Sequence, residues 1–548
     1  MTFNKIIFAA SLCLSLTTAP ITSHAQEQEA AAKYPTFEGN GLYDAGSPHN
    51  LGADIFHQSK RSEILKLINS SSKSGWHALD NLVVNTLLTT TELSTMQHDI
   101  APSNGNDLFT ARLNKLLDLG LYKKAYELYS TIKDAQTSEQ TSKAGVMAML
   151  YNNQRGKACL EVKISLPKYP AESFWRKMNA YCTITHSEEE NKDYWAIIEQ
   201  SNSAVSLELL KNKDQKSPYS KDILSSYSPI ELALATSQNA IDISKMPYDQ
   251  YAQISPKHID LLLLQPQLSD ENRIILSGYA ALYGTITAQE LESVFIEVSG
   301  ATTKQKSSGI LEILALYEDA KDAILGSTKT KKIDQAFKLA ETYGEGLLIP
   351  FIPFIQQLDA DDLSLNQVKR ALTLFVLSNA DVPKGWLSDL MDIKLENETD
   401  KKTLANIIFA TKTLSESVDK DDIESSQKFI NDYLLSDAYA SGLNYIIENI
   451  DSTENNSDKV FNIYENGFDL AAKKSYTMPP FVVTDELSRS SKNQNIAQTV
   501  LLASIIANKK PGHDVNLEVL EHVVNALIQI GYKKQARQIL AQAILEIE

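Results

Sequence analysis

Apolar side chains recur every three to four positions along most of the chain from Ala53 onward. The segment ADIFHQSKRSEILKLI (53–68) is typical, because its apolar residues gather on one face of a helix. The same spacing returns in LFTARLNKLLDLG (108–120), in NIAQTVLLASIIA (495–507) and in many segments between them. Few segments alternate with the period of two that a half-buried strand requires. The pattern therefore predicts an all-α protein with almost no sheet.

Residues that begin and end helices punctuate this pattern. Three Ser/Thr residues stand three positions before a Glu or Gln, the spacing of a capping box: Ser187 with Glu190, Thr287 with Glu290, and Ser364 with Gln367. Glycines that can close a helix in the left-handed conformation stand at 120, 284, 300, 344 and 531. Short helices joined by short turns pack antiparallel, and a long row of such pairs stacks into a superhelix.

Two segments near opposite ends of the chain are almost the same, LGLYKKAYELY (119–129) and IGYKKQARQIL (530–540). In both, an Ala stands five residues after a Gly and a large apolar residue stands nine after it. The matching positions are Gly120, Tyr122, Ala125 and Tyr129, and then Gly531, Tyr532, Ala536 and Leu540. In this interpretation the Gly ends one helix, the aromatic ring packs at the turn, and the Ala lets the neighbouring helix approach.

These residues resemble the second-helix half of a tetratricopeptide-type repeat. The first-helix signature with its Trp and Gly is not present, and no strict 34-residue period holds. The resemblance implies a right-handed α-solenoid of antiparallel helix pairs, preceded by an irregular N-terminal leader. The whole chain is also similar to uncharacterised secreted bacterial helical-repeat proteins, a resemblance that implies no activity.

The first residues predict export. Lys5 is followed by a mostly apolar run (6–16). The small residues Ser23 and Ala25 then occupy positions −3 and −1 of a predicted cleavage site after Ala25. This is the pattern of a secretory signal peptide (1–25), whose apolar core is too short to span a membrane. A mitochondrial presequence is the alternative, but arginine is absent from this segment. We expect the periplasm of a Gram-negative bacterium, or secretion otherwise.

Composition divides the remaining chain into four parts. Residues 26–52 are rich in Gly, Pro and Asn and predict a flexible or extended leader. Residues 53–212 and 230–548 form two predicted helical-repeat arms, separated by a polar linker or loop at 213–229. The alternative is a long loop within one continuous array.

The charge balance excludes some partners. The chain has 52 Lys and Arg against 69 Asp and Glu, a net charge of −17. Such a surface repels phosphate backbones, so we expect no nucleic-acid partner. After the first segment no run of 18 apolar residues follows, so we expect no stable membrane insertion.

Two cysteines, Cys159 and Cys182, follow the predicted signal peptide and lie symmetrically about Pro170. If Pro170 marks the turn of a helical hairpin, the two thiols lie abreast. An oxidising compartment favours a disulfide between them. Two buried free thiols are the alternative.

A search for catalytic motifs finds none. The chain lacks the nucleophile elbow, the phosphate-binding loop, the dinucleotide fingerprint and the zinc-protease helix motif. The acidic clusters at 359–362 and 419–422 lack the glycine and the terminal Glu of a calcium loop, so we interpret them as helix-capping residues. We therefore predict no catalytic residue, no metal site and no cofactor.

Two apolar segments interrupted by proline are candidate docking sites for a partner: GEGLLIPFIPFIQQL (344–358) and KKSYTMPPFVVTDEL (473–487). The candidate contact residues are Phe351, Ile352, Phe354, Pro479, Pro480 and Phe481. The alternative is that each segment is a non-helical plug buried between repeats.

The leading hypothesis is a non-catalytic scaffold that binds a protein or peptide partner in the cell envelope. A glycan-active hydrolase or lyase with a helical cleft is the first alternative, and converging Asp, Glu, Tyr and Trp in one deep pocket would favour it. A purely structural envelope spacer is the second alternative.

Overall fold

The protein is all-helical in the computed structural model, which describes residues 37–103, 106–132, 137–186, 217–218, 235, 241–242, 247–265, 268–301, 309–324, 326–415, 420–451, 481–508 and 516–547. The described part contains one minimal parallel sheet, in which β1 (Ser217–Pro218) pairs with β2 (Ile241–Asp242). The prediction of an all-α fold with almost no sheet is confirmed. The signal peptide and most of the predicted linker at 213–229 lie outside the described residues.

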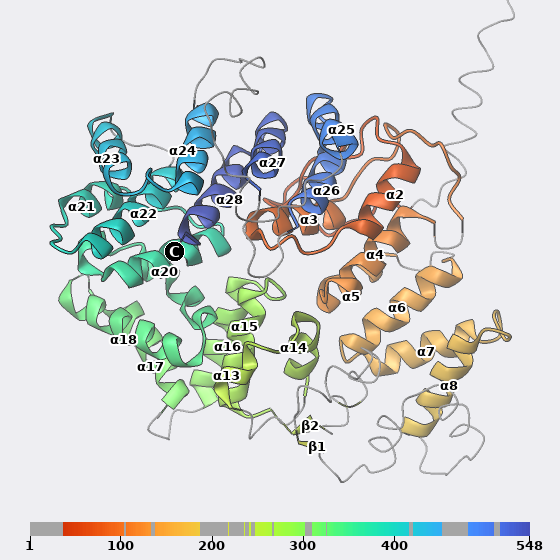
Figure 1. The fold of residues 1–548 in the computed structure, drawn as a ribbon. Coiled ribbons are helices and arrows are strands. Elements are labelled where there is room, and N and C mark those ends of the chain that lie inside the picture. The colour runs from red at the N-terminus through yellow and green to blue at the C-terminus, as the bar shows by residue number, and fades with distance from the viewer. Residues whose placement is uncertain are drawn as a thin grey trace, which may run out of the picture.

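The helices follow one another in short lengths (Figure 1). The first group comprises α2 (Arg61–Ser70), α3 (His77–Leu88), α4 (Leu108–Asp118), α5 (Tyr122–Tyr129), α6 (Glu139–Tyr151), α7 (Arg155–Ser165) and α8 (Ser173–His186). The middle group comprises α13 (Tyr248–Tyr251), α14 (Pro256–Leu263), α15 (Asp270–Leu282), α16 (Ala288–Ala301), η1 (Gly309–Leu311), α17 (Glu312–Asp322), α18 (Ser327–Tyr343), η2 (Glu345–Phe351), α19 (Ile352–Ile355), η3 (Ala360–Asp362) and α20 (Leu365–Leu377). The last group comprises α21 (Trp386–Asp392), α22 (Glu398–Leu414), α23 (Lys420–Tyr433), α24 (Ala438–Asp451), α25 (Phe481–Lys492), α26 (Ile496–Ile506), α27 (Leu517–Gln529) and α28 (Lys533–Leu545).

Four helical hairpins share the same three-residue connection: α4–α5, α6–α7, α25–α26 and α27–α28. The central residue of each connection has a positive φ, and these residues are Gly120, Asn153, Gln494 and Gly531. Around Gly531, the Gly531 N–H donates to Ile528 O and the Tyr532 N–H donates to Leu527 O. The equivalent pair of bonds is present at the other three turns. These are Schellman caps, so the two similar segments of the sequence mark two copies of one turn.

The helix-end predictions can be compared with the structure. Thr287 with Glu290 and Ser364 with Gln367 both form capping boxes, whereas Ser187 lies outside the described residues. Positive φ values are present at Gly284 and Gly344, as at Gly120 and Gly531. Gly300 is different, because it is the penultimate residue of α16, which ends at Ala301, and its φ is not positive.

Residues near the two ends of the chain pack together. The helices α2 and α3 contact α26, and α3 also contacts α28, which in turn packs against α20 and α22. Figure 1 shows the red N-terminal helices beside the blue C-terminal ones. In an open solenoid each repeat contacts only its sequence neighbours. These contacts join the first helices to the last, which the repeat pattern of the sequence does not predict.

The leader is irregular, as predicted, but its described part is not a free extension. Phe37, Glu38 and Leu51 are buried, and the backbone at 39–43 bonds to residues 88–91 after α3. The Glu38 carboxylate accepts two bonds from Arg61, at 2.6 and 2.7 Å, and one from the Leu108 N–H at 2.8 Å. Of the two predicted alternatives, flexible or extended, the packing of 37–52 favours an extended segment, which a buried ion pair holds.

No helix in the described part of the chain is both long enough and apolar enough to span a bilayer.

We predict that Glu38→Gln destabilises the protein by about 3–5 kcal/mol, because it leaves Arg61 buried without a counter-charge. The free energy of unfolding in urea measures this change. Glu63→Gln is the matched control, since Glu63 pairs with Lys60 on the surface, where such a pair contributes about 0–1 kcal/mol. Equal losses in the two variants would contradict a special role for Glu38.

The two similar turns allow a paired prediction. Gly120 and Gly531 have φ values of 78° and 90°, so an Ala at either site is strained by about 1–2 kcal/mol. A Cβ at 531 meets no neighbouring atom, whereas a Cβ at 120 would lie 2.9 Å from the Lys257 Cα. We expect Gly120→Ala to lower the urea midpoint more than Gly531→Ala. The reverse order would show that the α4–α5 turn does not pack tightly on α14.

Candidate functional site

The first predicted docking segment is buried. Phe351 and Ile352 lie in the core at the junction of η2 and α19, and Phe354 is half-buried against Tyr317. The segment lies against α15, where a Cβ on Gly346 would come within 1.9 Å of the Gly278 carbonyl oxygen. The structure buries this segment, as the alternative expected, but the segment is helical, because η2 and α19 cover it from Glu345 to Ile355. Phe351 and Ile352 present no surface to a partner.

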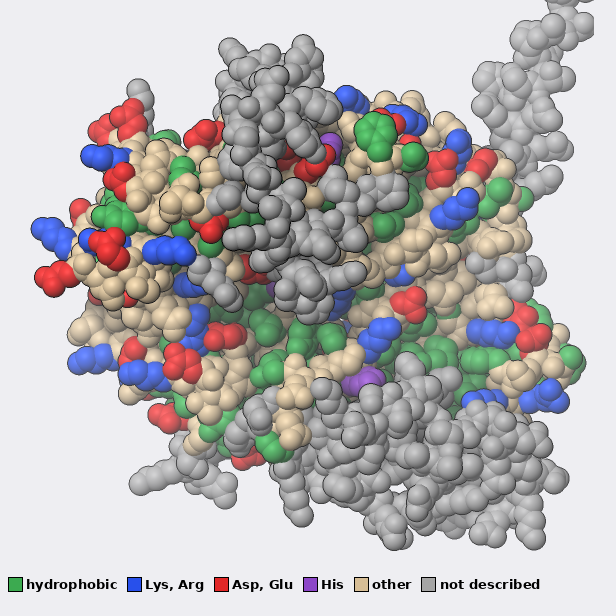
Figure 2. All heavy atoms as spheres, in the orientation of Figure 1, with side chains coloured by type: hydrophobic (Ala, Val, Ile, Leu, Met, Phe, Trp, Pro, Cys, Tyr) green, Lys and Arg blue, Asp and Glu red, His purple; other side chains and the backbone are tan. Residues whose placement is uncertain are grey.

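The second segment differs, because its described part is exposed. Phe481 and Val482, the first two residues of α25, are 80% and 75% exposed. The preceding Pro479 and Pro480 lie outside the described residues. Figure 2 shows charges of both signs interspersed over this face and a group of hydrophobic side chains over the upper end of α25. Of the predicted contact residues in the described part, Phe481 is the one that a partner can reach.

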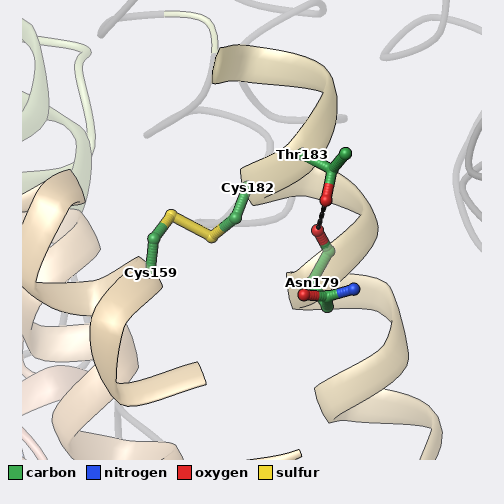
Figure 3. The surroundings of a disulfide bond; sticks show 4 residues. All are labelled: Cys159, Asn179, Cys182 and Thr183. Carbon is green, nitrogen blue, oxygen red and sulfur yellow. Dashed lines mark hydrogen bonds between the residues drawn. A yellow bond between two sulfur atoms is a disulfide. The ribbon is translucent and has the colours of Figure 1, made fainter. Parts of the chain in front are cut away.

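Cys159 of α7 and Cys182 of α8 form a disulfide with 5.6 Å between their Cα atoms (Figure 3). The turn containing Pro170 separates the two helices, so the predicted hairpin and its bridge are both confirmed. Around the bridge, α6, α7 and α8 share a small core of their own that includes Trp175, Met178 and Val162. The disulfide therefore stabilises a local unit beside the main core.

A cluster of charged residues joins the first helices to the middle of the chain. We call it the seam and define it by Lys73, Lys123, Asp260, Tyr283 and Glu290. Lys73 Nζ donates to the Tyr283 carbonyl oxygen at 2.9 Å, and Lys123 forms an ion pair with Glu290. Each bond joins residues more than 150 positions apart in the sequence. The seam thus brings α5 and the loop before α3 against α15 and α16.

Burial shifts the pKa values of several groups in the seam. Burial raises the pKa of Asp260 to about 6 and lowers the pKa values of Lys73 and Lys124. One Asp260 carboxylate oxygen and the Tyr122 hydroxyl are buried and have no hydrogen-bond partner among the described residues. Perturbed groups of this kind are common at functional sites, but buried joints between helices perturb pKa values as well.

The contacts of the seam favour the second explanation. The Glu290 carboxylate already accepts bonds from Lys123 and from the N–H and hydroxyl of Thr287. Its capping box with Thr287 was visible in the sequence, but its partner Lys123 was not. Within the described residues, no group of three or more His, Cys, Asp or Glu side chains is arranged to hold a metal ion. We interpret the seam as a structural joint.

Comparisons with protein families, with curated proteins and with solved structures gave no match for this chain.

The seam gives a prediction about pH. Because the pKa of Asp260 is raised above 3.8 in the folded state, its protonated form stabilises the fold, and this contribution is lost as the pH rises from about 4 through 6. Asp260→Asn should therefore leave stability unchanged near pH 4 and raise it by about 3 kcal/mol at pH 8. Urea unfolding at both pH values measures the difference.

Asp322→Asn, at the exposed end of α17, is the control and should change stability at pH 8 far less than Asp260→Asn does. A loss of stability in Asp260→Asn at pH 8 would mean that the ionised carboxylate stabilises the seam.

Proposed function

We propose that this protein is an exported, non-catalytic helical-repeat protein that binds or scaffolds a protein or peptide partner in the cell envelope, in the periplasm of a Gram-negative bacterium. Its hairpins form a right-handed, tetratricopeptide-like superhelix that the contacts of α3 with α26 and α28 close. The repeated turns at Gly120 and Gly531 and the disulfide between Cys159 and Cys182 support this proposal.

The observation that carries the proposal is the exposure of Phe481 and Val482 side by side at the start of α25. Burying one such side chain is favourable by roughly 1.5–3 kcal/mol. The following turn of the helix is anchored, because Thr484 and Leu487 are buried. An apolar pair on a fixed helix end is suited to insert into an apolar groove of a partner.

The carboxylates of the seam do not favour the glycan-active alternative. Glycoside cleavage requires one carboxyl group as proton donor and a second as base or nucleophile, both facing the sugar. In the seam, Glu290 is engaged by Lys123 and Thr287, and Asp260 has one buried oxygen. Neither group is placed to receive a polysaccharide.

The test is crosslinking of the protein in its native envelope, followed by mass spectrometry of the captured proteins. We predict that Phe481→Asp lowers capture of a reproducible protein set at least tenfold, because the charge must be desolvated on binding. The melting temperature should stay unchanged, since the ring is already exposed.

Ile324→Asp is the matched control, because Ile324 is 89% exposed and lies after α17, away from α25. Capture should persist in this variant. Capture of glycan alone would contradict the proposal and favour the hydrolase alternative, and equal loss in both variants would show that the effect is not local to α25.

A further inference from the structure

The helix α7 exposes two aliphatic side chains on its outer side. Leu160 and Ile164 are 60% and 48% exposed, and they lie one turn apart, so they share one face of the helix. The opposite face is committed to the fold, because Ala158 and Val162 are buried in the small core shared with α8. Figure 1 shows α7 and α8 at the edge of the described part of the molecule. The aliphatic pair is therefore open to a large partner.

Lysines border this aliphatic pair. Helical spacing places Lys157 and Lys163 on opposite sides of the pair, and Lys168 follows in the turn after α7. All three lysines are exposed. We define the α7 face by Lys157, Leu160, Lys163, Ile164 and Lys168. Aliphatic residues combined with lysines on a helix are typical of helices that lie in the interface of a membrane.

No carboxylate of the described residues is paired with these lysines. Lys157 Nζ donates to the Tyr126 hydroxyl, which is a neutral group, and lies 5.2 Å from the centre of that ring. Lys163 and Lys168 form no ion pair within the part of the chain that the structure describes. Their charges are therefore available to a partner.

The two acidic residues nearest in the sequence are engaged elsewhere. Glu161 is half-buried and accepts a hydrogen bond from the Ser165 hydroxyl at 3.3 Å. Glu172 forms an ion pair with Lys143 of α6, also at 3.3 Å. The chain has a net charge of −17, but salt screens charges that lie more than about 8 Å away. The α7 face is thus locally positive and can contact an anionic surface.

The residue types on the α7 face indicate lipid rather than protein. Protein–protein interfaces are depleted in Lys and enriched in Arg, Tyr and Trp. Lys has a long apolar stem that can lie along apolar surface while its charge stays in the aqueous layer. The α7 face contains Lys, Leu and Ile and neither Arg nor an aromatic residue. It therefore suits a layer of anionic headgroups better than the groove of a protein.

We propose that the α7 face binds reversibly to the surface of a membrane that contains anionic lipids. Leu160 and Ile164 enter the boundary between headgroups and acyl chains, and the three lysines contact lipid phosphates. In this arrangement α7 lies on the membrane and does not span it. The contact is on a different helix from Phe481, so it does not depend on the proposed docking of a protein partner.

The experiment is sedimentation of the purified mature chain (26–548) with vesicles of phosphatidylcholine, either alone or mixed with phosphatidylglycerol. We expect binding to the mixed vesicles at low salt, and about a hundredfold weaker binding to phosphatidylcholine alone, because three lysines lose their attraction. Lys163→Gln combined with Lys168→Gln should weaken binding to the mixed vesicles about thirtyfold. Leu160→Ser should weaken it about tenfold, because less apolar surface is buried.

Two matched controls should leave binding to the mixed vesicles unchanged. Lys331→Gln combined with Lys384→Gln makes the same change of charge at exposed positions on other segments. Ile296→Ser removes an aliphatic side chain that is 51% exposed on α16. A melting curve checks that each variant is folded. Phe481→Asp, which tests the docking site, should also bind vesicles normally, so that the two proposals can fail separately.

Three results would overturn the proposal: equal binding to the two kinds of vesicle, equal weakening in the control variants, or unchanged binding in both Leu160→Ser and the double lysine variant. A helical peptide of Leu and Glu residues provides a further comparison. Binding of this peptide without binding of vesicles would also overturn the proposal, and it would assign the α7 face to an acidic protein partner.

Discussion

The enclosure of α26 is the constraint on which the rest of the structure depends. Every residue of this helix is buried or half-buried, and α2, α3, α25 and α27 surround it. A helix that is apolar on all sides must be covered on all sides. Its ends are held from the N-terminal side as well, because the Ala497 N–H donates to Ile55 O and Trp76 Nε1 donates to Ala507 O. The first and last parts of the chain therefore form one core.

The buried ions near the leader fix the position of an irregular segment. Residues 37–52 have no helix or strand to fix their position, so side chains must do so. Arg112 donates to the carbonyl oxygens of Leu87, Thr89 and Glu38, while Arg61 holds the Glu38 carboxylate. Removing such ions from water is expensive, and burial lowers the pKa of Arg112 to about 10. The network is thus better understood as fixing one arrangement of an irregular segment than as a large source of stability.

The sequence predicted local features of the structure, such as the ends of helices. It did not predict contacts between residues that are far apart in the chain. Gly120 and Gly531 predicted helix ends because glycine favours a positive φ. The same turn at Gln494 gave no such signal, since its geometry is imposed by the hairpin. The sequence could not distinguish the two apolar, proline-interrupted segments. The first approaches Gly278 closely through Gly346, and its Phe351 is buried, whereas Phe481 of the second is 80% exposed. Residue spacing carries no information on such tertiary contacts.

At several helix C-termini, the carbonyl groups accept hydrogen bonds from Lys or Arg side chains that belong to other helices or loops. Capping helices in this way is one use that an acidic chain makes of its basic residues. The last turns of α2, α3, α15 and α20 contain no Lys or Arg of their own. The donors are Lys115 for α2, Arg112 for α3, Lys73 for α15, Lys534 for α20 and Arg537 for α22.

A cation at a helix C-terminus satisfies unpaired carbonyl groups and opposes the negative end of the helix dipole. When the cation comes from another helix, the same bond also joins two elements. Part of the positive charge is thereby placed at the joints between helices. Two of these joints, at the ends of α20 and α22, meet on α28, which supplies both Lys534 and Arg537. One helix near the C-terminus thus fixes the ends of two helices from the middle of the chain, because each cation both caps a helix and joins it to α28.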